Sequence, residues 1–160
     1  MLKKIFSPIL LLNLVLIIAF SVSINRLLYL ENINILFYIL FHITFIYLLF
    51  YHYHYSIYVL GLFYGVLFDF FLLNSIGSHL FCFILIISLF VVSKKYLFLM
   101  NSFQISTTFF ITLMSILFLE VFIAYLLNNI YFNLILMVKY FLFSSIIFVP
   151  IIYIFNKFDN

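Results

Sequence analysis

The chain has 160 residues, of which 69% are hydrophobic and 7% are charged, and its formal net charge is +3. A soluble globule of this length has too little interior to bury so much apolar surface, so the composition predicts an integral membrane protein with a single transmembrane domain, residues 1–160. The small, scattered positive charge argues against a nucleic-acid-binding surface. The single cysteine, Cys82, excludes a disulfide framework and a cysteine metal site.

Apolar stretches separated by polar breaks predict an all-α bundle of about six transmembrane helices. We expect these helices at about residues 8–23, 33–51, 57–73, 80–92, 103–127 and 138–155. The basic N-terminus followed by an apolar run is similar to a signal peptide, but Ala19-Phe-Ser21 is a weak cleavage site. We therefore interpret this run as an uncleaved first helix.

The distribution of basic residues predicts the orientation. With the N-terminus in the cytoplasm, six spans place five lysines on the inner side: Lys3, Lys4, Lys94, Lys95 and Lys157. Arg26 and Lys139 then fall on the outer side, which agrees with the positive-inside rule and makes both termini cytoplasmic. Five spans would place Lys157 outside and split the pattern, so six are preferred.

The third helix carries the most informative residues of the chain. Gly61, Gly65 and Asp69 are spaced four apart and share one helix face. Glycine inside a helix costs roughly 1 kcal/mol relative to alanine, so this pair predicts close approach by a neighbouring helix. A carboxylate at bilayer depth costs about 2.5–3.5 kcal/mol, so Asp69 should have a partner within the protein.

The polar break after the third helix, which contains Gly77, offers two structural roles for Asp69. His79 follows this break and is the histidine best placed to meet the carboxylate. Alternatively, Asp69 caps the start of the fourth helix by accepting hydrogen bonds from backbone N–H groups near Ser78.

Glu120 in the fifth helix and Lys139 near the start of the sixth are candidates for a buried polar pair. In the expected topology both Asp69 and Glu120 lie in the outer half of the membrane, on the side where His79 and Lys139 begin their helices. An outward-opening pocket is therefore one possible role for these groups. We favour the alternative, in which they form structural pairs. A proton path to the cytoplasm is not indicated, because both carboxylates lie in the same half.

No motif indicates enzyme chemistry. Ser78, His79 and Asp69 can be combined into a hydrolase triad, but an adjacent Ser and His on one turn do not give the required nucleophile–base geometry. His52 and His54 are a weak metal signal, because zinc requires about four ligands, and an aromatic interfacial turn explains them better. We therefore predict no enzymatic activity, no cofactor and no bound metal.

The pattern Gly61-xxx-Gly65-xxx-Asp69-x7-Gly77 follows two hydrophobic helices and precedes a helix that begins with a histidine. This arrangement resembles the family of the rod shape-determining protein MreD, in which a helix reading roughly G-x-x-x-G-x-x-x-D ends in a short polar break with a glycine.

The likeness extends over the layout of the whole chain: its length, the lysine-rich loop after the fourth helix, Glu120 inside the fifth, and Pro150 near the end of the last. Two features depart from the family. Asn34-Ile-Leu replaces the proline that often begins the second helix, and the histidine-rich turn at residues 52–54 is not typical.

The resemblance implies a non-enzymatic scaffold of the bacterial inner membrane, within the complex that synthesises lateral peptidoglycan during cell elongation. Its partners would be a bitopic MreC-like protein and, through it, MreB, RodA and a class B penicillin-binding protein. The residues assigned to helix packing or partner binding are Gly61, Gly65, Asp69, Gly77 and His79.

The same family is thought to be similar in fold to the substrate-binding subunits of energy-coupling-factor vitamin transporters. A subunit of that kind is therefore the alternative function. Against it, the first helix has only one alanine, Ala19, whereas those subunits resemble one another in an alanine-rich helix face that docks the coupling subunit.

Overall fold

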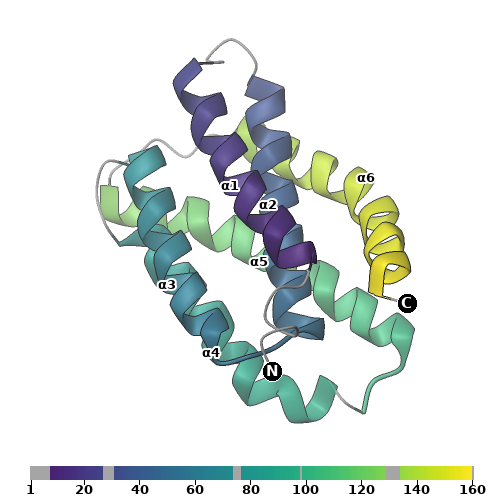
Figure 1. The fold of residues 1–160 in the computed structure, drawn as a ribbon. Helices are drawn as coiled ribbons and strands as arrows, with labels where there is room; N and C mark the ends of the chain where they lie inside the picture. The colour runs from purple at the N-terminus through teal and green to yellow at the C-terminus, as the bar shows by residue number, and fades with distance from the viewer. Residues whose placement is uncertain (1–7, 27–30, 74–76, 98, 129–133, 160) are drawn as a thin grey trace. The chain divides into compact units, whose positions relative to one another are not determined.

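The computed structural model describes residues 8–26, 31–73, 77–97, 99–128 and 134–159 (Figure 1). These residues form six α-helices and one π-helical segment, and no strand occurs among them, which confirms the all-α prediction. The elements are α1 (Pro8–Arg26), α2 (Glu31–Tyr51), α3 (Ser56–Phe68), η2 (Asp69–Leu73), α4 (Ser78–Leu97), α5 (Ser102–Asn128) and α6 (Leu134–Asp159).

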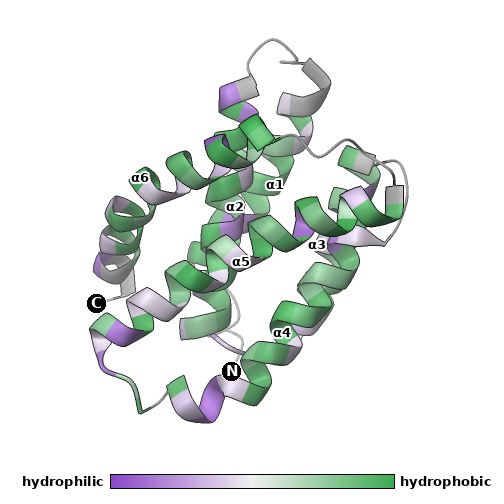
Figure 2. Ribbon diagram, turned by 180° about the vertical axis from the view of Figure 1, so that it is seen from behind, coloured by the Kyte–Doolittle hydropathy of each residue, from purple (hydrophilic) through white to green (hydrophobic). Residues whose placement is uncertain are grey.

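Within the described residues, four helices are long and apolar enough to cross a membrane. These spans are Asn32–Tyr51, Ser78–Leu97, Ser102–Leu127 and Leu134–Phe155. Shorter apolar stretches occupy α1 and the combined α3 and η2, at Pro8–Ser23 and Ser56–Leu72. Apolar residues cover most of each helix (Figure 2). The chain is accordingly a multi-pass membrane protein.

The α4 helix is longer than predicted at both ends. It begins at Ser78 rather than at residue 80, and it continues through Lys94 and Lys95 to Leu97 rather than ending at residue 92. Lysine is a good helix former, and a positive charge in the last turn interacts favourably with the helix dipole. The two lysines therefore extend this helix instead of ending it.

The α6 helix also differs from the prediction. It spans Leu134–Asp159, whereas the sequence predicted residues 138–155. Lys139 consequently lies in its second turn and Pro150 in its interior. Transmembrane helices tolerate proline when neighbouring groups satisfy the freed backbone carbonyl.

The chain divides into two compact units. The first contains Met1–Leu48 and Ile135–Asn160, with α1, most of α2 and nearly all of α6, and the second contains Leu49–Leu134, with the last residues of α2 and with α3, η2, α4 and α5. The single transmembrane domain over residues 1–160 stays a prediction.

In the first unit, polar side chains join α1 to α2. Buried Asn13 donates from Nδ2 to the backbone oxygen of Phe41 at 3.2 Å and to Oγ1 of Thr44 at 2.6 Å. Near the opposite ends of these helices, the Ser23 hydroxyl donates to Oδ1 of Asn34. Interhelical hydrogen bonds of this kind contribute roughly 0.6–2 kcal/mol each in a membrane.

Aromatic contacts join α2 to α6 in the same unit. The ring centroids of Tyr38 and Tyr140 lie 5.4 Å apart, and those of Tyr47 and Phe155 lie 5.0 Å apart. His42 is buried, and its Nδ1 lies 2.8 Å from the carbonyl oxygen of Tyr38 in its own helix. It is thus a hydrogen-bonded packing residue.

In the second unit, α4 packs against α3 and η2 on one side and against α5 on another. Phe68 and Phe83 stack with ring centroids 6.2 Å apart and join α3 to α4. Towards the other end of α4, the ring centroid of Phe50, at the end of α2, lies 5.2 Å from that of Phe90 in α4 and 5.4 Å from that of Phe109 in α5. These rings, all buried except the half-buried Phe50, hold α4 between its neighbours.

Candidate functional site

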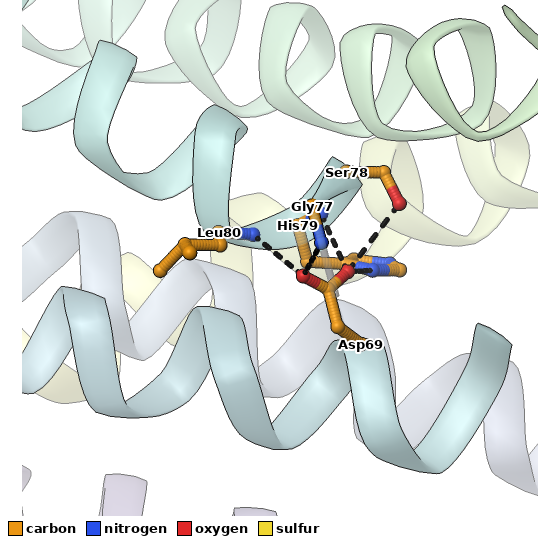
Figure 3. Close-up of polar contacts among 5 residues, drawn as sticks. All are labelled: Asp69, Gly77, Ser78, His79 and Leu80. Atoms are coloured by element: carbon orange, nitrogen blue, oxygen red, sulfur yellow. Dashed lines mark hydrogen bonds and ion pairs between the residues drawn. The ribbon is translucent and has the colours of Figure 1, made fainter. Parts of the chain in front are cut away.

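Asp69 directly follows α3 and begins the π-helical segment η2. Its side chain is fully buried, with 0% exposure, and points towards the start of α4 (Figure 3). Single π-helical turns are rare and occur frequently at functional sites.

The carboxylate of Asp69 accepts five hydrogen bonds, all from the beginning of α4 (Figure 3). Oδ2 accepts from the N–H of Gly77 at 2.7 Å and from the N–H of Leu80 at 3.3 Å. Oδ1 accepts from the N–H of His79 at 2.8 Å and from its ring Nδ1 at 2.9 Å. The Ser78 hydroxyl donates to the same oxygen at 3.3 Å.

This arrangement caps the α4 helix from outside the helix itself. Gly77 occupies the N-cap position, because its carbonyl accepts the first helical hydrogen bond, from the N–H of Phe81 at 2.9 Å. The side chain of an N-cap residue ordinarily accepts hydrogen bonds from the N–H groups two and three residues further on, but glycine has no side chain to do so. Asp69 supplies the missing acceptor to His79 and Leu80. Its negative charge also lies at the positive end of the helix dipole.

Two glycines allow the carboxylate to reach α4. A Cβ atom on Gly65 would lie 2.5 Å from Cα of Leu80 and 2.9 Å from its nitrogen, so a side chain there would push α3 and α4 apart. Gly77 has a φ of +151°, a backbone conformation that side-chain-bearing residues rarely adopt. Gly61 is buried one turn before Gly65 in α3.

His79 places its imidazole in an apolar environment. It is 3% exposed, and its ring stacks on Phe68 with centroids 5.8 Å apart. Because a carboxylate accepts hydrogen bonds, Nδ1 of His79 carries the hydrogen in its bond to Asp69. Buried away from water, this pair is stronger than an exposed pair, and losing Asp69 would leave the buried ring N–H of His79 without the acceptor it has here.

The geometry differs from that of a hydrolase triad. The Ser78 hydroxyl donates to Asp69 rather than to His79, so the histidine is not positioned to activate the serine. All three side chains are buried. Among the residues that the structure describes, no group of three or more His, Cys, Asp or Glu side chains could hold a metal ion. Chemically, the arrangement fixes α3 to α4.

Glu120 is buried in α5, within the second unit, and Lys139 is half-buried in α6, within the first. Their pairing stays a prediction. Cys82 is a buried free thiol in α4.

The predicted interfacial turn joins two helices. Nδ1 of His54 accepts a hydrogen bond from the backbone N–H of Ser56 at 3.3 Å, which satisfies one free donor at the start of α3. Nζ of Lys94, near the end of α4, lies 4.3 Å from the ring centroid of Tyr53. This cation–π contact holds the turn against α4.

Sequence reasoning did not single out Asn13, although it makes interhelical hydrogen bonds in the first unit. Its signal was a lone amide in the middle of the apolar stretch at residues 8–23. A polar side chain at that depth needs a partner from a neighbouring helix.

In comparisons with known proteins, no protein-family model, no curated protein and no solved structure matches this chain.

Proposed function

We propose that this protein is a non-enzymatic scaffold of the bacterial inner membrane that serves lateral peptidoglycan synthesis, as its resemblance to the MreD family implies. The observation that carries the proposal is that the polar groups of the family-like pattern form hydrogen bonds with one another inside the protein. The carboxylate of Asp69 and the ring Nδ1 of His79 both bond within the α3–α4 junction. A motif used in this way makes a rigid helix pair and leaves partner binding to the outer faces of the helices.

The proposed topology has six spans with both termini in the cytoplasm. The α1 helix has 19 residues and is about 28 Å long, which is close to the thickness of the hydrocarbon core of roughly 30 Å. The contact between Lys94 and Tyr53 supports this topology, since it joins the turn after α2 to the lysine-bearing end of α4. Both are cytoplasmic in this orientation, and the Asp69 cap lies on the outer side.

A stripe of apolar side chains on α3 and the adjoining η2 is the surface we assign to the partner. Its members are spaced at helical intervals and are exposed: Val59, Leu62, Phe63 and Phe70. Because Gly65 faces α4, this stripe is free to receive a transmembrane helix from the side. The partner would be an MreC-like bitopic protein and, through it, MreB, RodA and a class B penicillin-binding protein.

The experiment is affinity purification of the tagged full-length protein from native membranes in a mild detergent, followed by mass spectrometry. We expect an MreC-like protein and a penicillin-binding protein to copurify. Phe63→Ala should reduce their recovery, whereas Phe118→Ala, at an exposed position of α5, should not. Equal recovery with both variants would contradict the assignment of the stripe.

Recovery of ATPase subunits or of a bound small molecule would instead favour the alternative, a substrate-binding transporter subunit. That function requires an outward pocket around Asp69, His79, Glu120 and Lys139. A ligand would have to displace the hydrogen bonds that the Asp69 carboxylate already accepts from α4. This competition is the reason we prefer the scaffold.

A further inference from the structure

A cavity of about 220 Å³ lies between α4 and α5, at the end of α4 opposite the Asp69 cap. Aromatic, aliphatic and hydroxyl-bearing side chains form its wall, including Phe50, Phe90, Ser93, Tyr96, Thr112 and Ser115. All of its lining residues belong to the second unit. The cavity therefore lies within the second unit, between α4 and α5 and beside Phe50 at the end of α2.

The hydroxyl groups of the wall are largely committed to their own helices. Ser93 donates to the carbonyl oxygen of Leu89, Thr108 to that of Gln104 at 2.8 Å, and Thr112 to that of Thr108 at 2.8 Å. Apart from the hydroxyls of Tyr96 and Ser115, the wall consequently offers aromatic and aliphatic groups rather than free donors. An apolar cavity of about 150 Å³ is large enough to bind benzene, so this one has room for a segment of an aliphatic chain.

The mouth of the cavity carries groups suited to a lipid headgroup. Tyr96 lines the cavity and is 67% exposed. The neighbouring Lys95 is exposed, and Lys94 lies over the Tyr53 ring in the same last turns of α4. Tyrosine and lysine are the residues that typically lie at headgroup depth, where they contact phosphates.

We propose that the α4–α5 cavity binds one acyl chain of an anionic phospholipid, with the headgroup phosphate at Lys94 and Lys95. A bilayer supplies acyl chains at this depth, and the two positive charges select the anionic headgroup. Binding is independent of the scaffold function proposed above. In the proposed orientation the lysine-bearing end of α4 is cytoplasmic, which places this lipid in the cytoplasmic leaflet, and only this placement rests on the proposed function.

The chain contains no tryptophan, so a single introduced tryptophan can report on the cavity. We would reconstitute full-length Tyr96→Trp protein into phosphatidylcholine vesicles that contain a graded fraction of brominated phosphatidylglycerol. A parallel series would contain brominated phosphatidylcholine. We expect brominated phosphatidylglycerol to quench the tryptophan at a lower mole fraction than brominated phosphatidylcholine does.

Two pairs of variants divide the proposal into its parts. Ser115→Phe fills the cavity and should abolish the preference, whereas Ser88→Phe, at an exposed serine of α4 outside the wall, should retain it. Lys95→Gln should weaken the relative affinity for phosphatidylglycerol roughly fivefold, since a basic residue near an anionic surface contributes about 1 kcal/mol. Lys157→Gln, an exposed lysine in the last turn of α6, should leave it unchanged.

Equal quenching by the two brominated lipids, unaffected by Ser115→Phe, would overturn the proposal. Equal quenching that Ser115→Phe reduces for both lipids would overturn the headgroup selection. Slow thiol labelling of buried Cys82 checks that each variant is folded. If Ser115→Phe does not fold, the comparison of Lys95→Gln with Lys157→Gln still decides, because an unchanged preference in Lys95→Gln would refute the role of the lysine.

Discussion

Replacing Asp69 with alanine tests the helix cap directly. The substitution removes five hydrogen bonds to a charged acceptor, each contributing about 1.5 kcal/mol, or roughly 7 kcal/mol together. Removing the carboxylate also relieves about 3 kcal/mol of its cost of burial in the membrane. The difference predicts a loss of about 4 kcal/mol in the free energy of unfolding, within the range of roughly 3–5 kcal/mol for breaking a buried pair.

An exposed cap elsewhere in the chain provides a matched control. Oδ1 of Asn101 accepts from the N–H of Gln104 at 2.9 Å, and Oε1 of Gln104 accepts in return from the N–H of Asn101 at 3.1 Å. Asn101→Ala should cost only about 1 kcal/mol, because water can reach the freed donors. The comparison therefore separates a buried cap supplied by another helix from an ordinary local one.

The sole cysteine makes this comparison measurable. Cys82 is 1% exposed, so a fluorogenic maleimide reacts with it only when the protein opens. In a thermal ramp, Asp69→Ala should lower the labelling midpoint by roughly 8–16 °C and Asn101→Ala by roughly 2–4 °C. A shift for Asp69→Ala no larger than that of the control would refute the reasoning, and circular dichroism would verify that both signals follow the same transition.

Three further predictions follow from the same junction and from the topology. Gly65→Ala should destabilise the protein by about 1–3 kcal/mol in the same thermal assay, because its Cβ would lie 2.5 Å from Cα of Leu80; a midpoint at or above that of the wild type would disprove the close approach. Gly77→Ala should cost about 1–3 kcal/mol because of its φ of +151°, and an unchanged midpoint would show that this conformation is not required. In a background without the native cysteine, an impermeant maleimide applied to intact cells should label Tyr29→Cys and not Tyr55→Cys, and the reverse pattern would invert the proposed orientation.

The α3–α4 junction was largely foreseeable from the sequence, because a carboxylate and a pair of glycines are costly inside a membrane helix. Asp69 at bilayer depth needs a partner, and both of the partners considered for it, the backbone at the start of α4 and His79, are bonded to it. The glycine pair predicted close helix approach, and the structure shows such an approach at Gly65. The free-energy cost of these residues in a membrane helix therefore predicted their contacts.

Other features could not be predicted, because they involve no residue that is energetically unfavourable in a membrane helix and so demands a partner. The ends of α4 and α6 extended past their predicted limits, because Lys94 and Lys95 at the end of α4 and Lys157 at the end of α6 are compatible with either a helix or a loop. The π-helical segment at Asp69 has no signal in the sequence, where residues 57–73 were predicted as one continuous helix. The α4–α5 cavity is formed by side chains that are ordinary in any apolar helix, and only their packing leaves the space.

The most direct test of the proposed function is depletion of the protein from its native cells, with cell width and the incorporation of a fluorescent D-amino acid into the lateral wall measured by microscopy. The scaffold function predicts that cells widen and become round as lateral incorporation falls, and that expression of the wild-type chain restores both. Cells that keep their width and their lateral incorporation, while losing uptake of a small nutrient, would contradict the scaffold and favour the transporter subunit.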